Sequence, residues 1–369
     1  APVAARPTAA TTGSLGLSPL TAAFSGRPTI TAAEATGLAT ELVGSGQAVR
    51  AFRVDGADFA TAGADGSLQL ALTVAAALAP LRDPPAAGVS ASNALAQVTF
   101  AVSADDNQFA TIAKFRALRK IWARVADVVG QRDAGAAITH GVTDLSMLTQ
   151  RDPWVNMLRT TIAAFGAGVG GADQVTVLGF DGAIPADLRT SGARFSRRIA
   201  RNTQLLLLEE SNLGRVIDPA GGSWFVESLT DELAASAWTI FTEIEGLGGY
   251  RAALDAGWIT DRVGAALAAR DTSVAHRKTS VTGVNEFPNL GEKPIERAIA
   301  DDGAVATGTP KLVRVGHAFE ELRDRSDARL EATGARPRVL MIPLGSVAEH
   351  NGRTTVVSNL LASGRIDGV

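Results

Sequence analysis

The chain has 369 residues, of which 46% are hydrophobic and 20% charged, and its formal net charge is −3. Such a composition can bury a large core, and it shows no global excess of positive charge for binding nucleic acid. No apolar run reaches the roughly 18 to 20 residues of a membrane span, and the first residues have neither a basic region nor a compact apolar region typical of export. We therefore expect no membrane or nucleic-acid partner.

The chain contains no cysteine, which excludes disulfides, thiolate catalysis and cysteine-ligated metals. This absence is consistent with a cytoplasmic location, which we predict. Only four histidines remain as imidazole donors, and they are His140, His276, His317 and His350.

The first fourteen residues are rich in Ala, Pro, Thr and Gly and lack periodicity, so we expect a flexible tail or connector. Helical and strand patterns then alternate. They predict helices at Thr31 to Leu42 and Ser67 to Leu81, and strands at Val49 to Val54 and Ala96 to Ser103.

The same alternation continues through the next part of the chain. It predicts a long amphipathic helix at Asn107 to Val129, a strand at Ala136 to His140, a helix starting at Pro153 and a strand at Gln174 to Leu178. Four strands, each linked to a helix, favour a parallel sheet with right-handed crossovers. A complete eight-stranded barrel usually needs about 250 residues, so four repeats predict an α/β fold that contains only a portion of a (β/α)8 TIM barrel.

Residues 15–276 form this predicted barrel portion together with the helices at Leu229 to Leu247 and Tyr250 to His276. Residues 277–310 contain Pro288, Pro294 and Pro310 and predict a linker. Residues 311–369 then predict a helix (Leu312 to Ala332), a strand (Arg338 to Leu344), a turn at Gly345 and a helix (Thr354 to Ser363). This order is typical of the start of a flavodoxin-like domain.

The glycine-rich segment Gly166 to Gly171 matches the G-x-G-x-x-G dinucleotide fingerprint through Gly166, Gly168 and Gly171, and Gly170 lies at a variable position. That fingerprint requires a strand before the glycines and a helix after them, so that phosphate meets a helix N-terminus. Here a predicted helix precedes and a predicted strand follows. The glycines therefore indicate a helix C-terminus with close packing rather than a nucleotide site.

Two tracts carry a family resemblance. They read RDPWVNMLRTTIAAFGAGVGGADQVTVLGFD from Arg151 and RRIARNTQLLLLEESNLGRVIDPAGGSWFVE to Glu227. These tracts resemble the substrate barrel of adenosylcobalamin-dependent methylmalonyl-CoA mutases, and the chain looks like the second half of that barrel. In catalytic members of the family, an imidazole on the strand after the double glycine bonds the thioester carbonyl. Thr176 stands at the matching position here.

Two further positions, His140 and Val142, can be compared with the family pattern, and the second departs from it. The resemblance places a histidine at His140, at the end of a predicted strand where catalytic groups of barrels gather, so His140 is a candidate proton shuttle or thioester contact. The alternative is a hydrogen-bonded structural histidine. The family's glutamine two residues later is replaced by Val142.

The strand Arg338 to Leu344 and its turn resemble the start of the family's cobalamin domain, whose Asp-x-His-x-x-Gly motif supplies the cobalt ligand. Here the segment reads VAEHNG, so His350 lies one position from the ligand's place and Ala348 stands where the orienting carboxylate of such an imidazole would be. Pro343 replaces the lysine of the family pattern, and only Gly352 is kept. The resemblance therefore implies that neither Glu349 nor His350 binds cobalamin.

Two charged features remain to be assigned. Asp58 is the single charge in a segment where the resemblance expects substrate-facing groups, and we interpret it as a solvated loop or cap residue. Four arginines on one predicted helix could contact phosphates of coenzyme A, a partner or solvent, and they are Arg194, Arg197, Arg198 and Arg201. Gly221 and Gly222 of the DPAGGS tract are interpreted as turn residues.

The resemblance is closest to the small, non-catalytic subunits of two-subunit mutases. It implies a chain that stabilises a large catalytic subunit in a heterodimer, that has no catalytic, cofactor-binding or metal residues of its own, and whose partner holds adenosylcobalamin. Radical intermediates need tuned contacts and exclusion of water, so a chain without those contacts can serve as a scaffold. The alternatives are an active acyl-CoA mutase with a rearranged site at His140 and His350, or a nucleotide-binding α/β protein.

Overall fold

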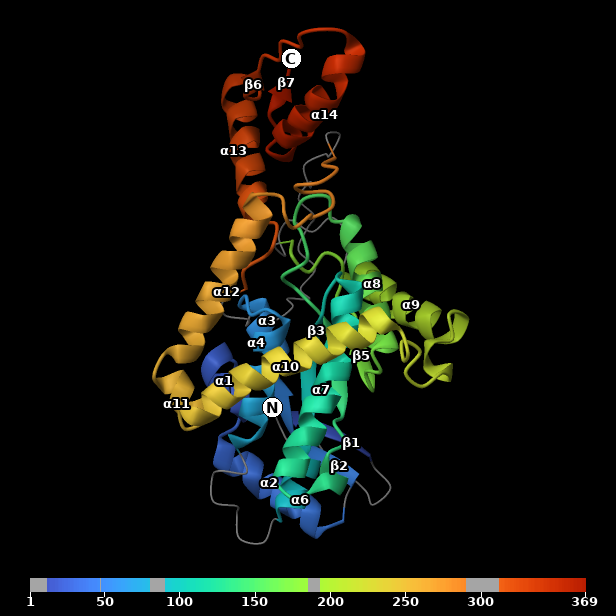
Figure 1. Cartoon of the computed structure of the whole chain (residues 1–369), viewed down its shortest axis with the longest axis vertical. Helices are drawn as coiled ribbons and strands as arrows, with labels where there is room; N and C mark the ends of the chain where they lie inside the picture. The colour runs from blue at the N-terminus through green and yellow to red at the C-terminus, as the bar shows by residue number, and fades with distance from the viewer. Residues whose placement is uncertain (1–11, 47, 80–89, 185–192, 290–311) are drawn as a thin grey trace.

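The computed structural model describes residues 12–46, 48–79, 90–184, 193–289 and 312–369. Within them, five strands form one sheet in the order of the chain, and every neighbouring pair is parallel. The strands are β1 (Thr12–Leu17), β2 (Ala48–Asp55), β3 (Val98–Ala104), β4 (Thr139–Thr143) and β5 (Gln174–Thr176). The sheet curls, as expected for a portion of a β/α barrel (Figure 1).

Strand β1 is not among the four strands predicted from the sequence. It begins inside the segment interpreted as a tail. Four of its six residues are exposed and two are glycines, so it lacks the buried apolar signature of a strand. Pairing with β2 defines it instead, with Thr12 opposite Ala48 and Leu17 opposite Phe52. Residues 1–11 lie outside the described part of the chain.

Helices connect successive strands, as the alternating pattern predicts. The helix α2 (Ala32–Gly44) begins with a capping box in which Thr31 and Glu34 satisfy each other's backbone N–H groups. The connection from β3 to β4 runs through α7 (Gln108–Val128), within one residue of the predicted bounds at each end, and Asn107 caps its start. The other connections contain α1 (Pro19–Ser25), α3 (Ala57–Thr61), α4 (Gly66–Ala77), α6 (Ala91–Ala96), η1 (Arg132–Ala134) and α8 (Val155–Val169).

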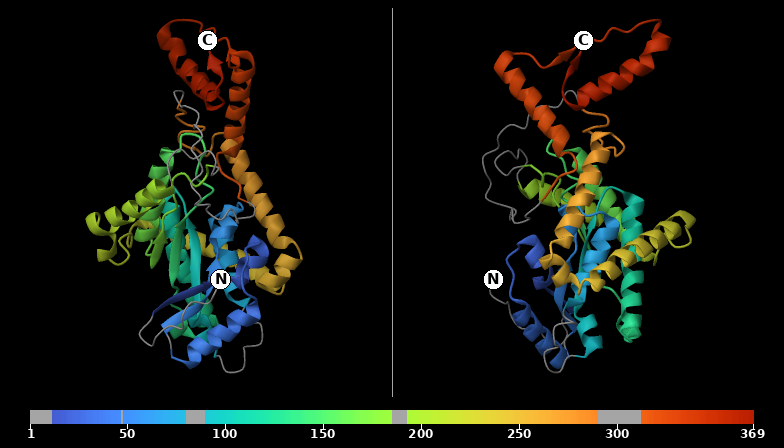
Figure 2. Two further views of the ribbon diagram at one scale, coloured as in Figure 1. Left: turned by 180° about the vertical axis from the view of Figure 1, so that it is seen from behind. Right: turned by 60° about the vertical axis from the view of Figure 1, so that its left-hand side comes forward.

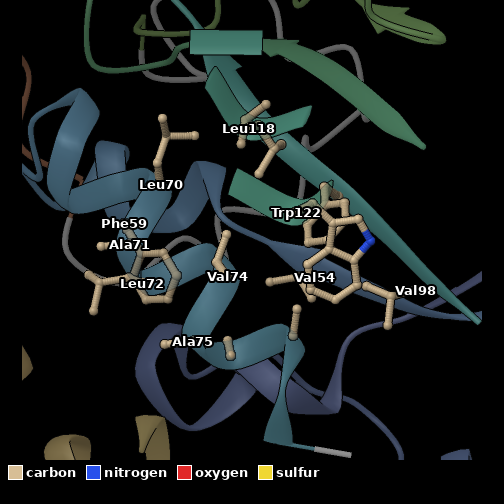
Figure 3. Packing of buried hydrophobic residues seen from close by; sticks show 14 of the residues in the cluster. Val54, Phe59, Leu70, Ala71, Leu72, Val74, Ala75, Val98, Leu118 and Trp122 are labelled. Atoms are coloured by element: carbon tan, nitrogen blue, oxygen red, sulfur yellow. The ribbon is translucent and has the colours of Figure 1, made fainter. Parts of the chain in front are cut away.

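The main core lies between the sheet and α4 and α7 (Figure 3). Trp122 on α7 packs edge-on against Phe100 of β3 at 4.8 Å between ring centroids, and Val54 of β2 is fully buried in the same cluster. Helix α10 (Trp224–Gly246) lies across α4 and α7, so residues 68–77 of α4 are buried on all sides (Figure 1). A helix this apolar around its whole circumference requires such a third layer.

Strand β4 begins three residues later than the sequence predicts, at Thr139 instead of Ala136. The residues before it follow the short helix η1 and make no strand ladder. Pairing to β3 begins with Phe100 opposite Thr139. The shift matters because it changes the place of His140 along the strand.

After β5 the chain leaves the sheet. It forms α9 (Ala193–Leu205), a π-helix η3 (Leu206–Glu210), a 3₁₀ turn η4 (Leu213–Arg215) and α10. The single helix expected from Tyr250 to His276 is two helices, α11 (Tyr250–Asp255) and α12 (Trp258–Ala275), because Gly257 adopts φ 78° between them. Such a left-handed residue terminates one helix and redirects the chain.

The last described segment contains α13 (His317–Thr333), β6 (Arg338–Val339), α14 (Val347–Ser363) and β7 (Asp367–Gly368). The strand predicted to reach Leu344 pairs over only two residues, with β7. The side chains of Leu340, Ile342 and Leu344 are more than two thirds exposed, so the described part of the chain supplies no packed layer over the rest of this segment. Figure 2 shows this unit beyond the end of α12.

Buried arginines attach this unit to the rest of the chain. Arg323 on α13 is almost fully buried and donates to the carbonyls of Gly283, Val284 and Ser363 at 2.8–3.0 Å. Arg151, which precedes α8, pairs through its Nη2 with Asp327 Oδ2 at 2.8 Å.

Among the described residues, no helix is long and apolar enough to cross a bilayer.

Candidate functional site

The two residues that define the family resemblance meet on neighbouring strands. His140 Nε2 lies 2.7 Å from Thr176 Oγ1, a hydrogen bond between β4 and β5. The register places Val142 opposite Thr176, so all three positions share one local surface. A Cβ built on Gly141, which points the other way, would touch Ala167 of α8 and Phe115 of α7. His140, Val142 and Thr176 therefore occupy the sheet face turned away from the helices.

Two charged side chains from β2 lie near this pair. Arg53 Nε is 2.5 Å from Asp55 Oδ1, and both residues belong to the same face of β2. Burial lowers the pKa of His140, the positive charge of Arg53 lowers it further, and Asp55 opposes them. The imidazole is therefore neutral at physiological pH.

The structure corrects the position of His140. It is the second residue of β4 and not its last, because the strand runs from Thr139 to Thr143. In β/α barrels, catalytic groups gather at the carboxyl ends of strands, whereas the amino ends mainly contribute stability. His140 thus lies at the end of the strand opposite to the one expected from sequence, which favours the structural alternative.

The chemistry open to this surface is limited. A threonine hydroxyl cannot be protonated at neutral pH, so Thr176 does not supply the charged or acidic donor that an imidazole can provide to a thioester carbonyl. The His140 ring uses one nitrogen for Thr176. Val142 adds no polar group. The surface can hydrogen-bond a ligand, but it lacks the constellation expected of a catalytic mutase.

Asp58 is buried, which contradicts the solvated role expected for it. The residue is 5% exposed on the short helix α3, and its Oδ1 accepts from Arg27 Nη2 at 2.6 Å. Burial raises its pKa, and the guanidinium of Arg27 opposes that effect. Tyr250, whose pKa is raised first by burial and then by the charge of Asp58, lies in the same region. Asp58 is therefore a buried carboxylate that pairs with a half-exposed arginine.

The histidine near the cobalt-ligand position lies on a helix and not on a loop. Helix α14 begins at Val347, seven residues before the predicted start at Thr354, and so includes His350. Its Nδ1 lies 3.3 Å from Thr354 Oγ1, one turn further along. Glu349 Oε2 accepts from the backbone N–H and the hydroxyl of Ser346 at 2.7 Å, and these bonds lower its pKa. Glu349 therefore caps the start of α14, whereas His350 uses only one ring nitrogen within the helix, and Ala348 offers no carboxylate to orient that ring toward a metal.

The glycine-rich motif behaves as the order of elements predicts. It closes α8 and precedes β5, and Gly171 has φ 80°. A Cβ on Gly166 would approach Thr111 Cγ2 to 3.0 Å, and one on Gly170 would approach Phe115 Cβ to 3.1 Å. The predicted order of helix, glycines and strand is confirmed, and the glycines allow α8 to approach α7 closely.

The DPAGGS tract is held by an arginine that the sequence did not single out. Arg116 of α7 binds Asp218 through two nitrogens, at 2.9 and 3.0 Å, and Glu227 at 2.7 Å. These carboxylates raise the pKa of Arg116 despite partial burial. Gly222, with φ 81°, donates its N–H to Glu227. The tract therefore joins α7 to the start of α10, consistent with the interpretation of its glycines as turn residues.

The arginine cluster lies on the outer face of α9. Each of the four side chains is exposed, and none forms an ion pair with a carboxylate within the described residues. Arg198 stacks over the ring of Phe195 at 5.3 Å. The cluster lines a surface hollow of about 690 Å³, and its lining residues are Arg194, Phe195, Arg197, Arg198 and Arg201.

A cavity at the carboxyl ends of β3 and β4 was missed from sequence. Its volume is about 400 Å³, and the buried Lys114 lies at its wall. The Lys114 ammonium donates to Ser103 O and Oγ at 3.1 Å and to Asp105 at 3.3 Å, which uses all three of its N–H groups. Burial raises the pKa of Asp144, which accepts from the Ser146 N–H.

The cavity had one available signal in the sequence, since Asp105 and Asp144 each follow directly after a buried strand. Its charges are satisfied by internal bonds. Among the described residues, no three His, Asp or Glu side chains gather closely enough to hold a metal ion.

Comparison with known proteins assigns the family. A family model described as methylmalonyl-CoA mutase matches residues 44–332. The chain belongs to the methylmalonyl-CoA mutase family. Membership confirms the resemblance seen in the barrel tracts, and the matched range includes β2 to β5 as well as α9 and α10.

Several relatives in this family carry the name of one subunit. The chain is 53% identical over 357 residues to the "Probable methylmalonyl-CoA mutase small subunit" of Mycobacterium tuberculosis, which covers 96% of this chain and 56% of that protein. It is 51% identical to the "Methylmalonyl-CoA mutase small subunit" of Streptomyces virginiae, over 87% and 51% of the two chains. The protein of that name from Propionibacterium freudenreichii is 39% identical, over 82% and 46%. The chain spans about half the length of these relatives.

Proposed function

We propose that this chain is the non-catalytic subunit of a methylmalonyl-CoA mutase and stabilises a larger subunit that interconverts methylmalonyl-CoA and succinyl-CoA. The names of its relatives support a small-subunit role. The observation that carries the proposal is the bonded pair of His140 and Thr176 beside Val142. A chain that keeps the barrel architecture but lacks the catalytic imidazole can serve as a scaffold for another subunit.

The cofactor assignment follows from the same reasoning. Adenosylcobalamin supplies the radical chemistry of such a mutase when it is bound. We propose that the larger subunit holds it, because Ala348 stands where the carboxylate that orients the family's cobalt ligand would be, and Glu349 caps α14 through Ser346. We therefore propose that this chain contributes no catalytic, cofactor-binding or metal-binding residues.

The domain division belongs to the same proposal. Residues 15–276 act as a barrel portion, residues 277–310 as a linker, and residues 311–369 as the opening βα unit of a degenerate flavodoxin-like domain. The order α13, β6, α14 supports this last assignment. A cytoplasmic heterodimer with the larger subunit completes the proposal.

Co-expression tests the proposed function. The full-length protein is produced with and without a larger mutase subunit, and each preparation is sized and assayed with methylmalonyl-CoA and adenosylcobalamin. We expect no turnover by this protein alone, a complex of both chains, and greater thermal stability of the larger subunit in that complex. Turnover by this protein alone would support the rearranged-site mutase instead.

The visible spectrum provides a second readout that does not depend on turnover. We expect the corrin absorption of cobalamin to remain unshifted when the purified protein is added. A stoichiometric shift that disappears in the His350→Ala variant would contradict the proposal and assign a cobalt ligand to α14.

A further inference from the structure

We infer that the arginine face of α9 is the docking surface for a carboxylate-rich patch of the larger subunit. The arginine face comprises Arg194, Arg197, Arg198 and Arg201, and the inference rests on the function proposed above. These residues occupy positions i, i+3, i+4 and i+7, so they project from one side of the helix. The opposite side packs onto the barrel portion.

The inner side of α9 shows how the helix is held. Ser196 Oγ donates to Asp181 Oδ1 at 2.5 Å, and Ala200 packs in a small cluster with Ala164 of α8 and Val177. Thr203 is buried on the same side. The arginines are therefore not needed to attach the helix, and Figure 1 shows α9 standing out beside α8. Their exposure leaves them available to a partner.

None of the four arginines forms an ion pair with a carboxylate among the described residues. Helix α9 contains no Asp or Glu, and Glu209 and Glu210 follow about two turns beyond Arg201. Helix α13 is different, because its arginines alternate with acidic residues such as Glu321, Asp324 and Asp327. An arginine face without nearby carboxylates repels itself, so a partner that supplies carboxylates is favoured.

The residue type and its exposed apolar neighbours favour a protein over a small anion. Arginine forms bidentate bonds with carboxylates and is enriched at protein interfaces. The face continues into the exposed side chains of Leu205 and Leu206. Arginine beside apolar side chains is typical of an interface core.

The test variant reverses two charges of the face. In Arg197→Glu/Arg201→Glu, both substitutions lie on exposed positions one helical turn apart. The matched control is Arg325→Glu/Arg329→Glu, which makes the same change at the same spacing on exposed positions of α13. Circular dichroism and thermal unfolding check that both variants of the full-length protein fold as the parent does.

The measurement is the dissociation constant of the full-length protein and the larger subunit at several salt concentrations. We expect the α9 variant to weaken the complex about 30-fold or more, and the α13 variant to change it less than about threefold. The affinity of the parent should fall as salt rises, and Arg197→Lys/Arg201→Lys should recover part of the binding.

Three outcomes would overturn the inference. If the parent protein forms no complex with the larger subunit, both the inference and the proposed function fail. If the complex forms but the α9 variant binds as tightly as the parent or no more weakly than the α13 variant, only the docking surface is wrong. If the α9 variant loses binding of coenzyme A or of a single-stranded oligonucleotide while the complex persists unchanged, the face serves that anion instead.

Discussion

The helix-facing side of the parallel sheet is closely packed and apolar, whereas the opposite side carries polar groups that bond to one another. Phe100 and Val54 are fully buried against α4 and α7 on the first side. On the second side, His140 bonds Thr176, and Arg53 lies against Asp55. Close packing limits which residues can occupy the first side, whereas only a catalytic role would limit the residues of the second side to particular chemical groups. This difference allows a barrel to keep its architecture after its catalytic groups have changed.

The largest effect is expected in the packed side. Replacing Trp122 by Ala removes an indole that contacts Phe100 and leaves a cavity in the main core. Such truncations cost about 3–5 kcal/mol, a large share of the stability of a typical domain. Urea unfolding followed by circular dichroism measures the loss. A loss of unfolding free energy below about 1 kcal/mol would show that packing on the helix-facing side contributes little to the stability of the fold.

Adjacent residues of β4 compare the two sides directly. A Cβ on Gly141 would stand 2.8 Å from Ala167 Cβ and 3.1 Å from Phe115 Cζ, so Gly141→Val overpacks the core and is expected to cost about 1–3 kcal/mol. Val142→Gln, on the opposite face, should change the free energy of unfolding by less than about 0.5 kcal/mol. The same unfolding assay measures both. Equal costs would remove the distinction between the faces.

The polar pair contributes a smaller amount. Thr176→Val keeps the shape of the side chain but removes the partner of His140. The expected loss is about 1 kcal/mol in unfolding free energy. A double-mutant cycle that uses His140→Ala, Thr176→Val and the two substitutions together measures the coupling energy between the two side chains. A coupling energy near zero would mean that the hydrogen bond does not stabilise the fold.

The smallest effect is a pH dependence. Burial lowers the pKa of His140 in the folded protein below its ordinary value of 6.5, so the unfolded chain takes up a proton first as the pH falls. The stability associated with the neutral ring is fully present above about pH 6.5 and is lost as the pH falls toward the folded pKa. Thermal unfolding at several pH values should show this decline in the parent. His140→Gln should flatten it, and the exposed control His276→Gln should not.

Local periodicity was enough to predict much of the helical framework. The span of α7 follows from the spacing of its apolar residues, a pattern that acts within a few turns. The rejection of a nucleotide site also follows from sequence, because it needs only the order of helix, glycines and strand. Four of the five strands were predicted from β-branched runs, though β4 was placed three residues too early.

The misplaced features depend on contacts between distant residues. Strand β1 exists because its backbone pairs with β2, and Asp58 is buried because Arg27 neutralises it. Arg116 was overlooked because its partners lie more than 100 residues away. No local pattern encodes such pairings, since loop closure brings the groups together only when the whole sheet forms.

The sequence by itself determined the family, the alternation of strands and helices, and the absence of an imidazole at Thr176, because each depends on the residue type at one position or on short-range periodicity. Only the tertiary structure decided which face of the sheet His140 occupies, at which end of its strand it lies, and that His350 is part of a helix. The physical reason is that a side chain's surroundings are set by register and by packing between elements, and neither quantity is a property of the residue alone.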